Sequence, residues 1–112
     1  MVSGKGKRVV LVTCRSLKEA RKIAAGVVGA RLAACVNVGT APVESVYLWK
    51  EKVETAREFL LVIKTTAARL GALEKEVTRL HSYDVPEFVV LEVSAGAREY
   101  LQWVEESVGR KA

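Results

Sequence analysis

The spacing of apolar residues along the chain alternates between a pattern typical of strands and one typical of helices. Residues 9–12 form a short run of Val and Leu, as expected for a strand that is buried on both faces. Apolar residues then recur at helical spacing over 17–28, and Ser16 and Glu19 precede them as a capping box. Gly29 is placed to end this helix in a left-handed conformation. The chain therefore begins with a predicted strand and helix.

The same alternation continues to the end of the chain and predicts the fold class. A second strand is predicted at 32–38 and continues at 43–49 after a bulge or bend; further strands follow at 53–65 and 87–93, and further helices at 67–81 and 96–108. The order of elements is β-α-β-β-α-β plus a terminal helix, which predicts an α+β, ferredoxin-like sandwich. In that fold the strand order is 4-1-3-2 and both main helices cover one face. We expect one domain over residues 8–109, with flexible tails at 1–7 and 110–112.

The second strand is too long for the helices that would cover it. With a bulge or bend at Gly39 and Pro42, it runs about 17 residues, or ~56 Å, whereas the first helix spans about 20 Å. The resulting β-hairpin carries a run of apolar residues beyond the helices: Val43, Val46, Tyr47, Leu48 and Trp49. Burial against another copy of the chain would hide this patch and its strand edge. A sharp bend at Pro42 that folds the hairpin back is the alternative.

The composition excludes several classes of protein. The chain has 112 residues, 50% of them hydrophobic and 28% charged, as in a soluble globular domain. The net charge of +5 comes from basic residues at the two ends: Lys5, Lys7, Arg8, Arg110 and Lys111. Because the rest of the chain is neutral and has no basic stripe, we expect no specific binding to nucleic acid. The scarcity of Asn, Gln and Met favours a thermostable protein.

Nothing in the sequence points to a membrane or to export. No apolar run approaches the ~18–20 residues that span a bilayer. The first residues, MVSGKGKR, contain no apolar stretch of the kind found in signal peptides. We therefore expect a cytoplasmic protein that does not bind membranes.

The residues that could carry chemistry are few. The common nucleotide-binding and hydrolase motifs (GxGxxG, GxxxxGK[ST] and GxSxG) are absent, and the two cysteines form no CxxC pair. Cys14 stands just before a predicted helix, where the N-terminus of a helix lowers a thiol pKa. An enzyme that uses Cys14 with His81 as base is one hypothesis. Because no third triad member or oxyanion loop accompanies them, we favour a role without catalysis.

Five segments occur in an order and spacing that is specific when they are taken together. They are RLAACVNV (31–38), SVYLW (45–49), LVIKTT (61–66), LHSYDVPE (80–87) and YLQWV (100–104). With them the chain resembles the CutA family of divalent-cation tolerance proteins over nearly its whole length. The resemblance implies a compact homotrimer of ferredoxin-like subunits that binds copper and is linked to tolerance of metal ions.

The chain departs from the family pattern in three places. Ser82 stands where the family usually has proline, although the neighbouring histidine is kept. The stretch between Asn37 and Trp49 is about one residue longer than usual. Glu51 stands where the hairpin commonly has glycine, which leaves the geometry of the hairpin tip open.

The copper ligands proposed for the family correspond to Cys14, Cys35 and His81. Imidazole suits Cu²⁺, and thiolate is the softer donor that favours Cu⁺. The predicted topology brings Cys14 and His81 to one edge of the sheet and places Cys35 at the opposite edge, so that Cys35 either joins from a neighbouring subunit or does not join at all. The alternatives are structural: Cys35 as a small buried apolar residue, and His81 as a cap of the second helix.

Other polar residues gather near the same rim: Arg15, Tyr83, Asp84 and Glu87, whereas Lys64 stands apart at the end of a strand, where it could enter a cleft between subunits. Carboxylates beside an imidazole suit a labile divalent cation. Arg15 and the open N–H groups of the predicted helix would equally suit an anion. The pattern therefore leaves two kinds of ligand open.

Two functions follow from these alternatives. The leading hypothesis is a homotrimeric copper-binding protein of metal-ion tolerance, with Tyr47 and Trp49 as anchors of the trimer interface. The other is a trimeric sensor of small molecules or anions, with sites between subunits where Lys64 would enter the cleft.

Overall fold

The computed structural model describes residues 1–109, and the C-terminal tail predicted at 110–112 lies outside them. The strands are β1 (Val2–Ser3), β2 (Lys7–Cys14), β3 (Cys35–Val38), β4 (Val43–Trp49), β5 (Lys52–Thr66), β6 (Val89–Glu92) and β7 (Ala95–Gly96). The helices are α1 (Leu17–Gly29), the short 3-10 helix η1 (Ala67–Arg69), α2 (Leu70–Leu80) and α3 (Arg98–Gly109).

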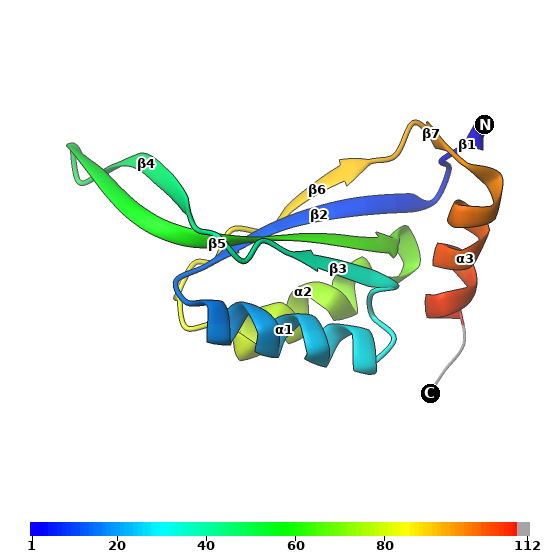
Figure 1. The fold of residues 1–112 in the computed structure, drawn as a ribbon, viewed down its shortest axis with the longest axis horizontal. Helices are drawn as coiled ribbons and strands as arrows, with labels where there is room; N and C mark the ends of the chain where they lie inside the picture. Colours follow the sequence, from blue (N-terminus) through cyan, green and yellow to red (C-terminus); the bar gives the residue numbers. More distant parts are fainter. Residues whose placement is uncertain (110–112) are drawn as a thin grey trace.

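The main sheet has the predicted ferredoxin-like arrangement. Its strands follow the order β3-β5-β2-β6, and β4 pairs with the other half of β5. Read from β6 to β3, and with β1, β4 and β7 left out of the count, this is the predicted strand order 4-1-3-2. The α+β fold is therefore confirmed. Helices α1 and α2 lie side by side on one face of the sheet, and α3 lies at the end of the sheet away from the hairpin (Figure 1).

The core lies between the sheet and this helix pair. Alternate residues of β2 and β5 point into it, and Val10 pairs with Ile63 and Val12 with Leu61. Helices α1 and α2 contribute five buried residues to this core: Ala20, Ile23, Val27, Leu73 and Val77. Since burying one large aliphatic side chain stabilises a fold by about 1.5–3 kcal/mol, this layer is the main source of stability.

The start of α1 is as predicted, but its end is not. The Ser16 hydroxyl accepts the Glu19 N–H at 3.1 Å, which confirms the N-cap. Gly29 is still helical, and the left-handed residue is Arg31, with φ 59°. Its guanidinium donates to the Ser107 carbonyl of α3 at 3.3 Å, a contact that glycine could not make.

The N-terminal segment, predicted as a flexible tail over 1–7, is part of the fold. Strand β1 pairs with β7, and the Gly4 N–H donates to the Ser94 carbonyl at 3.0 Å. A Cβ on Gly4 would lie 2.1 Å from the Val93 carbonyl oxygen, so only glycine fits there. The prediction was wrong because a two-residue strand is too short to show a periodic pattern.

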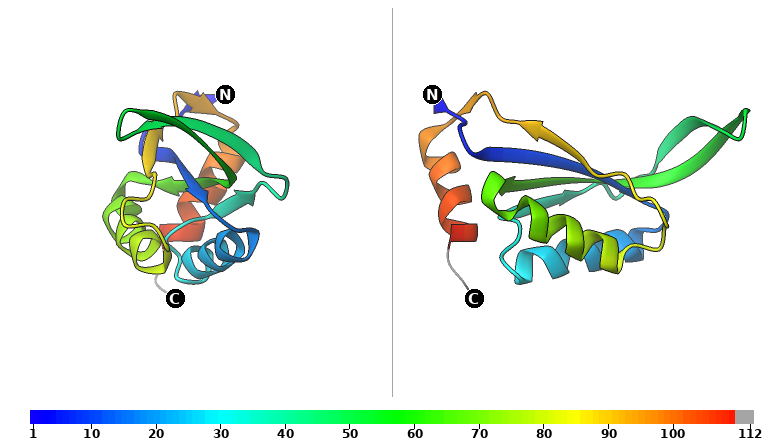
Figure 2. Two further views of the ribbon diagram at one scale, coloured as in Figure 1. Left: turned by 90° about the vertical axis from the view of Figure 1, so that its left-hand side faces the viewer. Right: turned by 180° about the vertical axis from the view of Figure 1, so that it is seen from behind.

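The long hairpin extends beyond the helices, as the strand lengths predicted. Figure 2 shows the β4–β5 arm extending away from the helix layer, so it is not folded back at Pro42. Residues 39–42 lie opposite residues 59–60, which makes them a bulge between β3 and β4. The arm leaves Leu48 70%, Trp49 61% and Val53 74% exposed.

The tip of the arm is a two-residue turn between Trp49 and Lys52. Lys50 and Glu51 both have positive φ, 50° and 65°, as a type I′ turn requires. The chain therefore keeps the tight turn without the glycine that such turns favour, at the expense of backbone strain.

No helix within residues 1–109 is long and apolar enough to cross a membrane.

The strained tip generates a prediction. Glu51→Gly should raise the free energy of unfolding by about 1 kcal/mol, because glycine adopts a positive φ without steric strain. Chemical denaturation measures the change. The matched control is Lys52→Gly, one residue further on in β5, where glycine should lower stability by about 0.5–1 kcal/mol. A Glu51→Gly protein that is no more stable than the parent would show that the turn is unstrained.

Candidate functional site

Three different elements bring metal-ligating side chains together. Cys14 is the last residue of β2, Glu19 lies in the first turn of α1, and His81 directly follows α2. One donor atom from each of them, a sulfur, a carboxylate oxygen and an imidazole nitrogen, lies within 4.8 Å of the other two. We call this group the Cys14–Glu19–His81 cluster.

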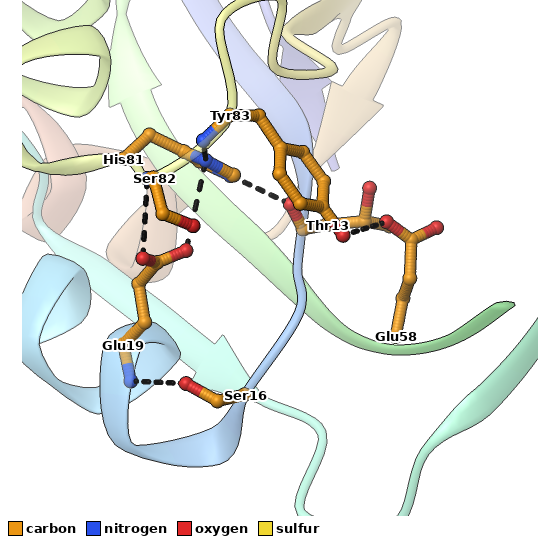
Figure 3. Close-up of polar contacts among 7 residues, drawn as sticks. All are labelled: Thr13, Ser16, Glu19, Glu58, His81, Ser82 and Tyr83. Carbon is orange, nitrogen blue, oxygen red and sulfur yellow. Dashed lines mark hydrogen bonds and ion pairs between the residues drawn. The ribbon is translucent and has the colours of Figure 1, made fainter.

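The Glu19 side chain belongs to this cluster because it leaves the capping box half made. Its backbone N–H bonds to Ser16, but its carboxylate turns away from the cap (Figure 3). Oxygen Oε1 accepts the Ser82 N–H at 3.1 Å and so ties α1 to the loop after α2. Oxygen Oε2 is left facing His81.

The hydrogen bonds of His81 determine where its proton lies. Atom Nε2 is 2.8 Å from the Thr13 carbonyl oxygen, which can only accept, so Nε2 carries the hydrogen. Atom Nδ1 accepts the Tyr83 N–H at 3.1 Å with its lone pair. In this arrangement Nε2 carries the ring hydrogen, and the Nδ1 lone pair of the buried ring faces the loop and Glu19.

Glu19 Oε2 is a buried carboxylate oxygen that has no hydrogen-bond partner within the described residues 1–109. It lies 3.6 Å from His81 Nδ1, so two electron-pair donors face each other without a hydrogen between them. Leaving such an atom unpaired costs about 1–3 kcal/mol or more. A cation held between these atoms would remove that penalty. Sulfur, imidazole and carboxylate donors together fit zinc or copper.

The Cys14 thiol is protonated at neutral pH. Its burial, followed by the charges of Glu19 and Glu58, raises the pKa of Cys14 to about 12. A fully buried, protonated thiol is a poor nucleophile, which argues against the hypothesis of a cysteine-dependent enzyme. It can still ligate a metal that displaces its proton.

A second contact joins the cluster to the hairpin. The Tyr83 hydroxyl donates to Glu58 Oε2 at 2.8 Å, and the centroid of its ring lies 4.7 Å from that of His81. Burial and this bond to Glu58 raise the pKa of Tyr83 to about 12. The pKa of Glu87 is raised as well, first by burial and then by the charge of Glu58. The surroundings of the cluster are thus rich in carboxyl groups.

Cys35 lies far from this cluster. It pairs with Lys64 on β5, whereas Cys14 pairs with Phe59, a separation of about 17 Å along the strand. Cys35 and Lys64 also share a cross-strand row with Val9, which faces away from the core. The placement of Cys35 apart from Cys14, expected from topology, is confirmed.

The other predicted rim residues take different places. Arg15 and Asp84 are exposed, and Lys64 bonds the Asn37 side-chain oxygen on the other face of the sheet. Glu19 and Glu58 were not predicted as site residues. Glu19 matched a capping box fully, and Glu58 is one of several charged residues on a strand. The available signal for Glu19 was its position in the first helical turn after Cys14.

Comparison with known proteins agrees with this fold. The family model described as CutA1 divalent ion tolerance protein matches residues 8–107. The Divalent-cation tolerance protein CutA of Thermus thermophilus is 44% identical over 103 residues, which cover 92% of this chain and 99% of that protein. Its namesake from Archaeoglobus fulgidus is 35% identical over 99 residues, covering 88% and 95%.

Solved structures show the same relationship. The structure of the divalent cation tolerance protein (Cut A1) from Thermus thermophilus superposes with a TM-score of 0.89 at 44% identity, covering 92% of this chain and 99% of that one. The match extends over both the sheet and the helices that carry the cluster. The chain belongs to the CutA1 family of divalent ion tolerance proteins.

Proposed function

We propose that this protein binds a divalent metal ion, copper in particular, at the Cys14–Glu19–His81 cluster, and that it acts in metal-ion tolerance as a homotrimer. The observation that carries the proposal is the convergence of three unlike donors within 4.8 Å, one of them a buried carboxylate oxygen without a partner among residues 1–109. The family name speaks of divalent ions, and this cluster supplies the ligands for one.

The surroundings of His81 support a ligand role. Metal-binding histidines usually donate their second N–H to a carbonyl or carboxylate, which fixes the ring and directs the other nitrogen at the metal. The Nε2–H bond to Thr13 has this form and leaves Nδ1 as the donor. Cu²⁺ is the first-row divalent ion that such nitrogen and sulfur donors hold most tightly, and Cys14 extends the preference toward Cu⁺.

Electrostatics favours a cation over an anion at this site. Three carboxyl groups, those of Glu19, Glu58 and Glu87, act on one another or on Cys14 through their charge. The first turn of α1 presents the carboxylate of Glu19 to the site. This negative charge would repel an anion, whereas an anion-binding helix presents open N–H groups. These contacts support metal binding above the anion-sensing alternative.

The exposed hairpin supports self-association. Its arm carries Val46, Tyr47, Leu48, Trp49 and Val53, each at least 45% exposed. Large exposed apolar side chains on both faces of a two-stranded ribbon mark a protein–protein interface or an aggregation site. Burial against copies of the same chain removes the liability, and Tyr47 and Trp49 are the residue types that anchor interfaces.

The ligand assignment predicts a specific ranking of variants. In reduced protein without a His-tag, His81→Ala should weaken Cu²⁺ binding at least tenfold, which is ~1.4 kcal/mol. Glu19→Gln should also weaken it about tenfold, because the amide keeps the acceptor for Ser82 but loses the charge. Calorimetric titration measures both. Cys35→Ser is the matched control, and its affinity should equal that of the parent.

If His81→Ala binds copper as tightly as the parent, the metal site is elsewhere. If Cys35→Ser loses affinity as His81→Ala does, the ligand set includes a neighbouring subunit.

The raised pKa of Cys14 predicts a pH dependence. Because the free thiol keeps its proton up to about pH 12, a metal that binds the thiolate must release one proton at neutral pH. Zn²⁺ affinity should therefore rise about tenfold per pH unit between about pH 7 and 8.5. Cys14→Ser should remove this slope. Calorimetry in buffers of different ionisation enthalpy counts the protons released, and a parent protein that releases none would contradict thiolate ligation.

The trimer predicts a mass of three times 12.2 kDa by light scattering at micromolar concentration. Trp49→Ala should dissociate the trimer or lower its melting temperature, since truncating a buried tryptophan costs ~3–5 kcal/mol. Val28→Ala, which shortens a partly exposed apolar residue on α1, is the control and should keep the mass. A parent protein that stays monomeric would rule out the interface.

A further inference from the structure

The lone pair on His81 Nδ1 has two competing uses. It accepts the backbone N–H of Tyr83 at 3.1 Å, and it is also the donor that faces Glu19 Oε2 at 3.6 Å. One imidazole lone pair serves a hydrogen or a metal ion, but not both. The other ring nitrogen offers no substitute, because Nε2 uses its hydrogen on the Thr13 carbonyl.

We propose that the loop of residues 82–87 is a metal-responsive switch, in which a divalent ion at the Cys14–Glu19–His81 cluster displaces the Tyr83 N–H from His81. The inference rests on the proposed function and adds to it a competitor for the metal that the chain itself carries. Tyr83 is then a positioning residue, which acts on the metal through His81.

The contacts of Tyr83 show what holds the metal-free form. The residue is fixed at both ends, since its N–H bonds to His81 and its hydroxyl donates to Glu58 Oε2 at 2.8 Å (Figure 3). Its ring also packs beside the imidazole, with centroids 4.7 Å apart. The bond to Glu58 therefore keeps the backbone of Tyr83 near Nδ1. Breaking that bond should favour the form in which Nδ1 is free.

The switch reaches the hairpin through Glu58. This residue pairs with Val43, the first residue of β4, so it lies where the arm leaves the main sheet. A displaced Tyr83 would release a hydrogen bond at the base of the arm. Metal binding is thereby coupled to the contact at the base of the arm, and such coupling acts equally in both directions.

Because the coupling acts in both directions, removing the Tyr83–Glu58 contact should strengthen metal binding rather than weaken it. If the Tyr83–Glu58 bond opposes the metal, then Tyr83→Phe, which removes only the hydroxyl, should bind Zn²⁺ about fivefold more tightly than the parent. Zn²⁺ is the probe because it ligates the same donors without oxidising the thiol. Tyr100→Phe on α3 is the matched control and should bind as the parent does. A Tyr83→Phe affinity that is equal to or weaker than that of the parent overturns the inference.

Amide exchange supplies a readout that does not depend on affinity. In NMR spectra of the ¹⁵N-labelled parent, the Tyr83 amide should be protected without metal and should exchange faster when Zn²⁺ is bound. The Ala34 amide, which bonds to Lys64 within the sheet, should be unchanged. A Tyr83 amide that stays equally protected with Zn²⁺ bound overturns the switch.

The two proposals fail in different ways. If Zn²⁺ binding does not depend on Cys14 and His81, the proposed function fails and the switch fails with it. Suppose instead that Zn²⁺ binding depends on both residues, but Tyr83→Phe has the affinity of the parent and the exchange rate of the Tyr83 amide does not change with Zn²⁺. In that case only the switch fails.

Discussion

The pairing of β5 with three partners at once is the constraint on which the other features depend. One half of this strand, which has 15 residues, pairs with β2 on one side and β3 on the other, and the other half pairs with β4 beyond the core. The half that pairs with β2 and β3 is buried beneath α1 and α2, whereas no described element covers the half that pairs with β4 (Figure 1). Because β5 extends beyond the core, the apolar β4–β5 arm is left exposed. The same strand fixes the point where the core and the arm meet.

The candidate metal site lies at that junction. Strand β2 ends at Cys14 opposite Phe59, the residue next to Glu58, and α1 begins within three residues. Helix α2 runs back along the same face and delivers His81 to this end of the sheet. The three side chains thus meet because the connections between their elements are short and all three reach the same edge of the sheet. The same geometry puts Tyr83 and Glu58 between the site and the arm.

The sequence was sufficient for features that follow from topology and was insufficient for those that depend on single side chains. Alternating apolar patterns predicted the sheet order, the overhanging hairpin and the meeting of Cys14 with His81 apart from Cys35. The pattern could not show that Glu19 abandons its cap for Ser82, because a capping box looks the same whichever way its carboxylate turns. It also missed β1, whose two residues have no period, and the left-handed Arg31, where a tertiary bond to Ser107 replaces the conformational freedom of glycine.

Oxygen Oε2 of Glu19 is buried by the fold but lacks a hydrogen-bond partner within residues 1–109. It breaks the general rule that buried polar atoms are hydrogen-bonded. The neighbouring polar groups are paired: Oε1 holds Ser82, and the two nitrogens of His81 hold Thr13 and Tyr83. Oxygen Oε2 remains, buried and facing a lone pair. Sequences that fold well keep such conflicts mainly at functional sites, where a ligand resolves them. A proton on Nδ1 would satisfy Oε2 but would take the acceptor from the Tyr83 N–H. A metal ion would do the same while also using the sulfur of Cys14, which a proton leaves idle. The presence of a third, soft donor is therefore the argument for a metal.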